Sequence, residues 1–305
     1  MAGSHWRPWP RFWSNGVTEI SPPIDKLQAR IAFERAAGSY DGAAVLQRQT
    51  GENMLERLEV VRLQPRVILD VGAGTGLAAA ALARRYKKAR IIALDFALPM
   101  LRHARRRGPW LRRPLCVCGD AEQLPLADGS VDLIFSNAAI QWCNDLEHTF
   151  AGFRRVLRPG GLLMFSTFGP DTLKELRQAW GAVDGHTHVS PFPDMHDVGD
   201  ALIRSGFADP VVDADRMTLT YENVRGLMRD LKAIGAHNVT TRRRRGLTGK
   251  GRMQAMVDAY EAFRSNGRLP ASYEVVYGHA WAPEQRRRDS NVEVSVDQLV
   301  RSRLR

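Results

Sequence analysis

Short apolar runs alternate with amphipathic stretches through the first half of the chain. The runs have the length and continuous apolar character of strands buried on both faces of a sheet, and they lie at 67–70, 90–95, 115–119, 131–137 and 162–167. Apolar residues at helical spacing occupy 77–86, 99–107 and 145–157 between them. This alternation predicts an α/β protein with a doubly wound parallel sheet, whose functional residues lie at the carboxyl ends of the strands.

Helical patterns also precede and follow this alternating core. Two helices are predicted at 24–37 and 43–63, with Tyr40 at the break between them. Beyond Gly169 the pattern predicts helices at 173–183, 194–205, 222–235 and 252–264, and strands at 209–220 and 273–277. We therefore expect one domain over 24–281, helical lid insertions at about 168–189 and 221–268, and disordered tails at 1–23 and 282–305.

A glycine-rich loop follows the first predicted strand. Its residues are Asp70, Gly72, Gly74 and Gly76. Glycines let the backbone approach a nucleotide-like ligand closely, and Asp95, which ends the next strand, is placed as the acid that takes ribose hydroxyls. A dinucleotide-binding loop has the spacing G-x-G-x-x-G instead, and Asp70 would repel a pyrophosphate but attract an ammonium group. The loop favours S-adenosylmethionine over a dinucleotide, with a plain glycine turn as the alternative.

This loop resembles motif I of the class I, Rossmann-like S-adenosylmethionine-dependent methyltransferases. Segments 119–137 and 157–167 resemble the motifs that come next in that family. The resemblance implies that Asp120 holds the exocyclic amine of adenine, that Ala121 packs on the ring, and that the backbone of Asn137 lies where methyl donor and acceptor meet. Tyr40 is expected to cover the cofactor, and an amphipathic core tyrosine is the equal alternative. The expected cofactor-binding residues are Tyr40, Gln47, Asp70, Gly72, Gly74, Gly76, Asp95, Phe96, Asp120, Ala121 and Asn137.

The residues after the fourth predicted strand narrow the acceptor chemistry. A DNA amine methyltransferase would carry Asn/Asp-Pro-Pro-aromatic there, but this chain has the segment 136–140, SNAAI. No cluster of metal ligands is apparent, and His186 and His188 are interpreted as polar loop residues, so we expect no metal site. A carboxylate acceptor is already ionised at pH 7, so it requires no catalytic base, only positioning and partial loss of water.

Four further segments, at 33–47, 136–146, 165–180 and 231–238, resemble the malonyl-acyl-carrier-protein O-methyltransferases of biotin synthesis. The resemblance spans about 24–281 and implies methyl transfer to the free carboxylate of malonyl on acyl carrier protein. Trp142 would then line the acceptor pocket together with Tyr40, with a core tryptophan as the alternative. Arg229 and Lys232 are the first candidates to bind the carboxylate, and an exposed helix face is the plain alternative.

The chain is basic, with 44 Lys and Arg against 33 Asp and Glu and a net charge of +11. Two acid-free clusters, Arg102–Arg113 and Arg242–Arg252, carry much of this charge. A nucleic acid, an acidic protein or a plain solvated surface each explains such clusters. Aromatic residues do not interleave with the arginines, which argues against nucleic acid. The family resemblance implies that an acidic acyl carrier protein docks on the second cluster, at Arg242, Arg243, Arg244, Arg245, Lys250 and Arg252.

The three cysteines are odd in number, which favours free thiols in a reducing cytoplasm. No apolar run approaches the roughly 20 residues of a membrane span.

Three alternatives to the malonyl-carrier reaction stay open at this point. The first is another small-acid or quinone-precursor methyltransferase, and the second is a relative of the arginine hydroxylase of complex I assembly. The third is a docking protein that binds the cofactor without catalysis. Malonyl-acyl carrier protein and malonyl-coenzyme A are not separated by the sequence.

Overall fold

A single mixed sheet forms the centre of the protein. Among the residues that the computed structural model describes (23–108, 112–241, 246 and 248–284), seven strands lie in the order β3-β2-β1-β4-β5-β7-β6. The strands are β1 (Val67–Val71), β2 (Arg90–Asp95), β3 (Leu115–Cys118), β4 (Val131–Ser136), β5 (Leu157–Phe168), β6 (Ala208–Tyr221) and β7 (Leu269–Trp281). The first five strands are parallel, whereas β7 is antiparallel to both β5 and β6. The predicted α/β, doubly wound fold is confirmed, but the sheet is mixed rather than wholly parallel.

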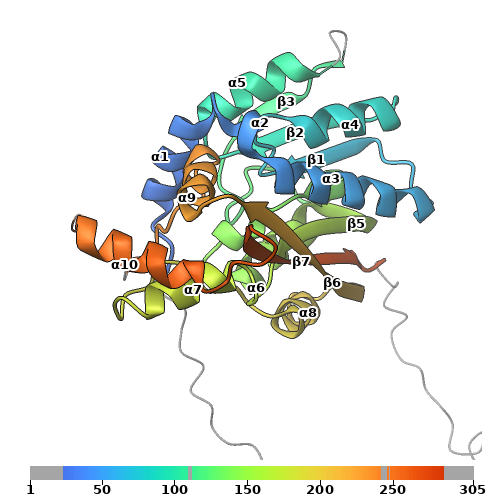
Figure 1. Ribbon diagram of the computed structural model, residues 1–305. Coiled ribbons are helices and arrows are strands. Elements are labelled where there is room, and N and C mark those ends of the chain that lie inside the picture. The colour runs from blue at the N-terminus through green and yellow to red at the C-terminus, as the bar shows by residue number, and fades with distance from the viewer. Residues whose placement is uncertain (1–22, 109–111, 242–245, 247, 285–305) are drawn as a thin grey trace, which may run out of the picture.

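Helices cover both faces of this sheet and one of its ends (Figure 1). Those before β1 are α1 (Lys26–Ala36), α2 (Tyr40–Ala43), α3 (Val45–Arg57) and the short η1 (Leu58–Val60). Those between the parallel strands are α4 (Leu77–Arg85), α5 (Leu98–Arg107), η3 (Ile140–Trp142) and α6 (Leu146–Val156). Those after β5 are α7 (Lys174–Gly181), α8 (Met195–Arg204), α9 (Val224–Ala233) and α10 (Lys250–Glu261). None of the described helices is long and apolar enough to cross a membrane.

The region around Tyr40 differs from its prediction. Tyr40 begins the short helix α2 instead of lying in a break. Ala44 interrupts the helical path with a ψ of 49° and separates α2 from α3. The helix expected at 43–63 is therefore α3 followed by η1, and it ends at Val60. Helix α1 begins as predicted near Asp25, whose carboxylate accepts a hydrogen bond from the Gln28 amide at 3.1 Å and so caps the first turn.

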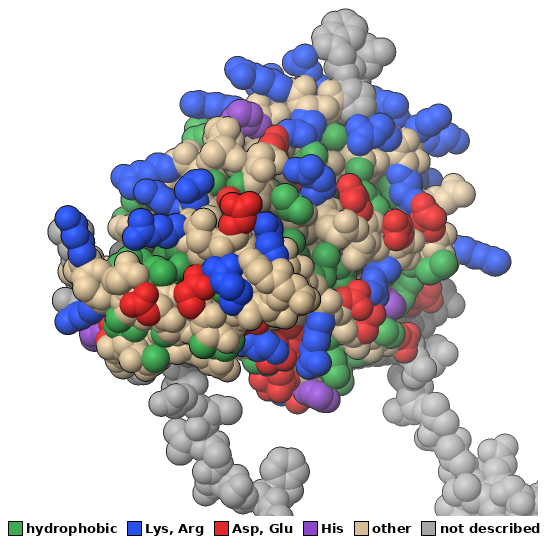
Figure 2. Space-filling view, viewed as in Figure 1, with side chains coloured by type: hydrophobic (Ala, Val, Ile, Leu, Met, Phe, Trp, Pro, Cys, Tyr) green, Lys and Arg blue, Asp and Glu red, His purple; other side chains and the backbone are tan. Residues whose placement is uncertain are grey.

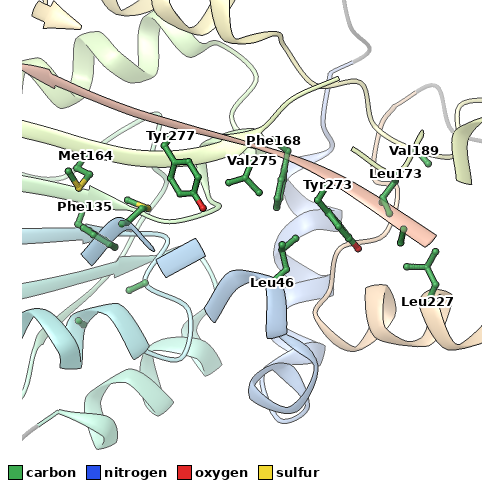
Figure 3. Packing of buried hydrophobic residues seen from close by; sticks show 14 of the residues in the cluster. Leu46, Phe135, Met164, Phe168, Leu173, Val189, Leu227, Tyr273, Val275 and Tyr277 are labelled. Atoms are coloured by element: carbon green, nitrogen blue, oxygen red, sulfur yellow. The ribbon is translucent and has the colours of Figure 1, made fainter. Parts of the chain in front are cut away.

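Successive residues of the central strands point into different core clusters. Ile68 and Phe135 belong to the larger cluster, which continues to α7, α9 and α10, while Leu69 and Ile134 belong to the cluster under α6 and α8. Side chains alternate between the two faces of a sheet, and both faces are covered, so most positions in these strands are apolar. The exceptions include Asp70 and Ser136, which are buried near the carboxyl ends of β1 and β4. Figure 3 shows the larger cluster from the sheet outward.

Strand β5 begins earlier than the sequence pattern predicts. Residues 158–161, which read as a turn between helix and strand, lie within β5. Val131 pairs with Leu157 and Leu133 with Leu162, so the extra residues form a bulge that Gly160 enables with a φ of +73°. The proline and glycines at 158–161 indicate an irregular backbone at this point, but they do not distinguish a bulge within a strand from a turn before it.

Strand β7 lies between β5 and the edge strand β6. It is longer than the predicted 273–277, and it pairs with β5 along its second half and with β6 along its whole length. Gly278 lies opposite Phe165, where a Cβ atom would stand 2.2 Å from the ring, so glycine permits this pairing. Ala282 extends the backbone bonding to Gly160 and Gly161. The expected disordered stretches fall largely on 1–22 and 285–305, outside the described residues.

Candidate functional site

The glycine loop is held at the carboxyl ends of β1 and β2. The amides of Gly72 and Ala73 donate to the Leu94 carbonyl at 2.8 and 3.0 Å, and the Gly74 amide donates to Asp95 Oδ2 at 2.8 Å. A Cβ atom on Gly72 would stand 2.3 Å from the Cβ of Ala139, and Gly72 has a φ of +69°. Glycine is therefore required here both by conformation and by close approach.

The third glycine packs helices together. A Cβ atom on Gly76 would stand 2.6 Å from the Cα of Ala104 in α5. Gly76 does not line the narrow pocket beside the loop. Its close packing against α5 therefore accounts for a glycine at this position, with no contact to a ligand required.

Asp70 is buried beneath the loop. It is 1% exposed, and its Oδ2 has no hydrogen-bond partner among the described residues. Burial, together with the nearby charge of Asp95, raises the pKa of Asp70 to about 7, although the Ala79 amide opposes this shift. Burial likewise raises the pKa of Asp95 to about 6. Two carboxylates thus share a poorly solvated region at the strand ends, where positive charge would be stabilised.

A narrow pocket opens beside this loop. The predicted cofactor residues that line it are Tyr40, Gly72, Gly74, Asp95, Phe96, Asp120, Ala121 and Asn137. Asp70, Gly76 and Gln47 do not line it. Sequence reasoning missed Lys26, Phe33, Met100 and Cys143, which also line it. Lys26 and Phe33 come from α1, far from the strands in sequence, so no local motif marks them.

Asp120 shares a cation with its neighbour Glu122. Lys26 Nζ lies 2.8 Å from Asp120 Oδ1 and 2.6 Å from Glu122 Oε2. Burial disfavours the ammonium group, but its acidic surroundings outweigh this effect, so the net result is a raised pKa for Lys26. Helix α1 therefore holds the Asp120 carboxylate in place through Lys26.

A second ion pair fixes Tyr40 above the loop. Asp41 accepts a hydrogen bond from Thr75 Oγ1 at 2.5 Å and pairs with Arg107, whose Nε also donates to the Thr75 carbonyl at 3.0 Å. The Tyr40 ring consequently lies 3.9 Å from the position of a Cβ on Gly74. Burial, with Asp95 and Asp41 nearby, raises the pKa of Tyr40 well above its ordinary value, so its hydroxyl stays protonated.

The Asn137 side chain joins elements around the pocket. Its Oδ1 accepts from Thr50 at 2.9 Å and from Ser166 at 2.8 Å, and its Nδ2 donates to the Gln47 carbonyl at 2.7 Å. All of these contacts lie within the protein. The residue lines the pocket as predicted, but its amide side chain is already occupied in holding α3 against β4 and β5.

A larger cavity of about 840 Å³ adjoins the first. The two share Phe33, Tyr40, Ala138 and Trp142, so these residues form the junction between them. The walls are mostly apolar and come from α7, α9 and the strand ends; Phe168 and Tyr273 contact each other there with ring centroids 6.2 Å apart (Figure 3). A large, mostly apolar cavity that adjoins a narrow pocket with acidic residues in its wall can hold an acceptor against a bound cofactor.

The predicted substrate residues lie in or beside this cavity. Trp142 lies at the junction, with its ring edge-on to Phe33 at 5.1 Å, and Gln47, expected at the cofactor, lines the larger cavity. Arg229 and Lys232 line the cavity from α9 with exposed side chains. Lys250 and Arg252 are exposed at the start of α10, and Arg242–Arg245 lie outside the described residues.

His188 lies in the wall of the larger cavity, which its loop position did not indicate. Its ring stacks on Trp180 at 3.8 Å, and Nε2 lies 2.8 Å from Asp184 Oδ1. No group of three or more His, Cys, Asp or Glu residues in the described part of the chain is arranged to hold a metal ion.

Comparison with known proteins decides the family. A methyltransferase-domain family matches residues 69–165. The chain is 54% identical over 269 residues to the malonyl-[acyl-carrier protein] O-methyltransferase of a Methylovorus species, covering 86% of this chain and 91% of the relative. The enzyme of the same name from Gallionella capsiferriformans is also 54% identical, covering 86% of this chain and 93% of the relative. This chain belongs to the malonyl-[acyl-carrier protein] O-methyltransferase family.

The solved structures agree on the fold. A candidate methyltransferase from Bacillus halodurans is 18% identical and superposes with a TM-score of 0.55 over 76% of this chain and 99% of that one. As a member of the malonyl-[acyl-carrier protein] O-methyltransferase family, the chain is a methyltransferase with S-adenosylmethionine as its cofactor.

The pocket fits this cofactor. S-adenosylmethionine presents positive charge, hydroxyls and an amine, all of which seek acceptors. The strand ends offer Asp95 and Asp120 in the pocket wall and the Oδ2 of Asp70, unpartnered among the described residues, behind it. Gly72 and Gly74 leave the loop backbone accessible to the ligand.

Proposed function

We propose that this enzyme forms the methyl ester of the free carboxylate of malonyl carried on acyl carrier protein, an early step of biotin synthesis. The junction residues Phe33, Tyr40, Ala138 and Trp142 carry the proposal, because they connect a methyl-donor pocket to an apolar acceptor cavity. The relatives that are 54% identical over 86% of the chain are named for this substrate.

Residues at the junction supply positioning. Tyr40 is the strongest candidate, because it lines both the pocket and the larger cavity and its phenol hydroxyl can donate to a carboxylate oxygen. Gln47 lines the larger cavity, and its side-chain amide would be a second donor. Phe33 and Trp142 exclude water around the acceptor, which leaves the carboxylate less solvated and more nucleophilic.

Asp95, Asp120, Ala121 and the glycine loop would hold the cofactor, with Asp70 beneath them. When bound, S-adenosylmethionine supplies a methyl group on a positively charged sulfur, and its transfer to a carboxylate oxygen leaves a neutral thioether. No proton moves in this reaction, so no base is required.

The inserted segments 168–189 and 221–268 act as the lid of the acceptor site in this proposal. Their helices α7 and α9 contribute Leu176, Trp180 and Met228 to the cavity wall. Helix α1 is tied to the same region, because Ile24 pairs with Thr240 and the Asp25 amide donates to the Val239 carbonyl at 2.9 Å. The lid therefore contacts both the cofactor side and the acceptor side.

An acidic carrier protein is the proposed partner. The run Arg242–Arg252 comes directly after α9 and its connecting segment and offers a concentrated positive charge. Its exposed members Lys250 and Arg252 lie at the start of α10, and α10 contributes Met253 to the cavity wall. We place the reaction in the cytoplasm, where the free thiols of Cys116, Cys118 and Cys143 remain reduced.

Methyl transfer from labelled S-adenosylmethionine tests the function. Malonyl-, succinyl- and acetyl-acyl carrier protein are offered side by side, and base-labile label on the malonyl carrier alone is the expected result. Replacing Arg242, Arg243, Arg244 and Arg245 by Ala should reduce labelling of the carrier without affecting malonyl-coenzyme A. Absence of label on every carrier, despite cofactor binding, would refute the proposal.

A further inference from the structure

Helix α9 presents a row of cations along the larger cavity. Arg225, Arg229 and Lys232 are exposed and recur at intervals of four and three residues, which places them on one helix face. Val224 and Leu227 on the opposite side are buried in the core. All three cations line the cavity. The exposed part of its lining is therefore positively charged, whereas most of the remaining wall is apolar.

These cations have no acidic partner among the described residues. Their side chains make no ion pair or hydrogen bond with any residue in that part of the chain. Asp230, the acid within α9, interacts instead with Tyr221, whose pKa is raised to about 12, chiefly by burial. Some other exposed arginines do have acidic partners, as Arg204 has in Glu147 at 2.6 Å. Like charges one turn apart repel each other on a helix, so the spacing of Arg225 and Arg229 does not stabilise α9.

The row is fixed close to the junction at one of its ends. Ser39 Oγ donates to the Ala233 carbonyl at 2.8 Å, next to Lys232, and thereby joins α9 to the segment that carries Tyr40. Gly235, with a φ of +76°, lets the end of α9 approach the Ala32 backbone, where a Cβ atom would stand 3.2 Å away. From Lys232 to Arg225 the helix rises by about 10 Å, away from the junction.

Figure 2 shows Lys and Arg side chains gathered over α1 and α9 on this face of the molecule. Arg35 of α1 also lines the cavity and is exposed. The mouth of the acceptor cavity therefore attracts anions, while its walls accept an apolar chain.

The size of the cavity indicates what fills it. A malonyl group is too small to occupy about 840 Å³, so most of the space is available to the arm that delivers it. In carrier proteins and in coenzyme A this arm is phosphopantetheine, a pantetheine chain whose end distant from the thiol carries a phosphate. Exposed guanidinium and ammonium groups suit a phosphate that stays partly hydrated. The carboxylate that reacts must instead lose water at the junction, away from exposed cations.

We propose that Arg225, Arg229 and Lys232 bind the phosphate of the pantetheine arm of the acyl thioester. This inference rests on the proposed function, since it takes a malonyl thioester as the substrate. It assigns Arg229 and Lys232 to the arm rather than to the carboxylate. The row then sets how far the arm enters and brings the acyl end to Tyr40.

Two small substrates that differ only in the phosphate test this site. Malonyl-phosphopantetheine and malonyl-pantetheine are compared with the wild type, with Arg229→Gln, and with the triple variant Arg225→Gln, Arg229→Gln, Lys232→Gln. The control is Arg102→Gln, which removes an exposed charge from α5. The triple variant should raise KM for the phosphorylated substrate about 10- to 100-fold and leave kcat unchanged. Its KM for malonyl-pantetheine should stay within about twofold of the wild type.

Equal losses with both substrates would mean that the row acts on the malonyl group, and no loss with either would mean that it binds nothing; both results overturn the inference. Binding of acyl-free phosphopantetheine and pantetheine, measured by calorimetry, separates this site from the reaction. Preferential binding of phosphopantetheine without methylation of any malonyl thioester refutes the proposed function alone. Methylation with no preference for the phosphorylated arm refutes this inference alone.

Discussion

Lys26 and Asp120 form an ion pair across the cofactor pocket, with Nζ 2.8 Å from Oδ1. The pair joins the first helix to the end of β3, and Glu122 completes it at 2.6 Å. Without the cation, two carboxylates would face each other at the place proposed for the adenine amine. The position of Asp120 thus depends on a residue that precedes the sheet by some distance in the chain.

Replacing Lys26 by Met should therefore weaken S-adenosylmethionine binding about tenfold, roughly 1.4 kcal/mol, because the acids repel and turn away. Calorimetric titration of the cofactor measures this change. Arg57→Gln is the control, since it breaks an exposed ion pair with Asp213 elsewhere on the protein. Unchanged affinity in Lys26→Met would contradict the role given to the ion pair.

Gly72→Ala should destabilise the protein by more than its backbone conformation alone requires. Gly129 provides the matched control, because its φ is +55° and nothing lies within 4 Å of an added Cβ, whereas Gly72 faces Ala139. We expect Gly129→Ala to cost about 1–2 kcal/mol and Gly72→Ala clearly more. Urea denaturation of both variants gives the comparison. Equal losses would show that Ala139 moves aside without cost.

The raised pKa of the buried Asp70 carboxyl group predicts an unusual dependence of protein stability on pH. Its pKa is about 7 in the folded protein against an ordinary value of 3.8, so the folded state holds the proton more tightly than the unfolded state. The stability that this group contributes is complete below about pH 3.8 and is lost as the pH rises through about 7. At pH 8 the buried charge opposes folding by an amount on the order of 2–4 kcal/mol.

Asp70→Asn should remove this pH-dependent term, so the cofactor-free variant gains stability relative to the wild type as the pH rises from 5 to 8. Other carboxyl groups titrate in both proteins, so the difference in unfolding free energy between them is the quantity to measure. The same variant should bind S-adenosylmethionine less tightly, because it lacks the buried negative charge. A difference in stability that does not vary with pH would show that the carboxyl group is not protonated on folding.

Tyr40→Phe should lower kcat/KM for malonyl-acyl carrier protein about 10- to 100-fold, the effect of losing one hydrogen bond to a charged group. The affinity for S-adenosylmethionine should change little, because the ring that covers Gly74 remains. Steady-state kinetics and cofactor titration together separate the two roles of this residue.

Tyr260→Phe is the control for this substitution, because its hydroxyl donates to the Pro270 carbonyl at 2.8 Å and does not line either cavity. It should lose some stability and retain its kcat/KM. Weaker S-adenosylmethionine binding in Tyr40→Phe, with kcat and the KM for the carrier unchanged at saturating cofactor, would make Tyr40 a cofactor residue only.

The strands and helices were largely predictable, because burial on one or both faces leaves a periodic pattern in the chain. The loop residues Gly72 and Gly74, and the acids Asp95 and Asp120, were predictable because strand ends converge at one edge of a sheet.

Contacts between distant segments left no such pattern. Lys26 lies in an ordinary amphipathic helix, and nothing nearby in sequence indicates that it reaches Asp120. Gln47 was assigned to the cofactor from its nearness to Tyr40, but helix geometry places it in the larger cavity. The direction of β7 depends on which strand edge remains available after β5 has formed, and a single sequence does not contain that information.

The place of β7 in the sheet also sets an order of events during synthesis. β6 leaves the ribosome before its only hydrogen-bonded neighbour in the described sheet exists, and the intervening segment takes a few seconds to make at roughly 5–20 residues per second. During that time the edge of β5 and the whole of β6 are open to wrong pairing. Tyr273, part of the cavity wall, belongs to β7, so a nascent chain cannot form a complete acceptor site before this strand has been made.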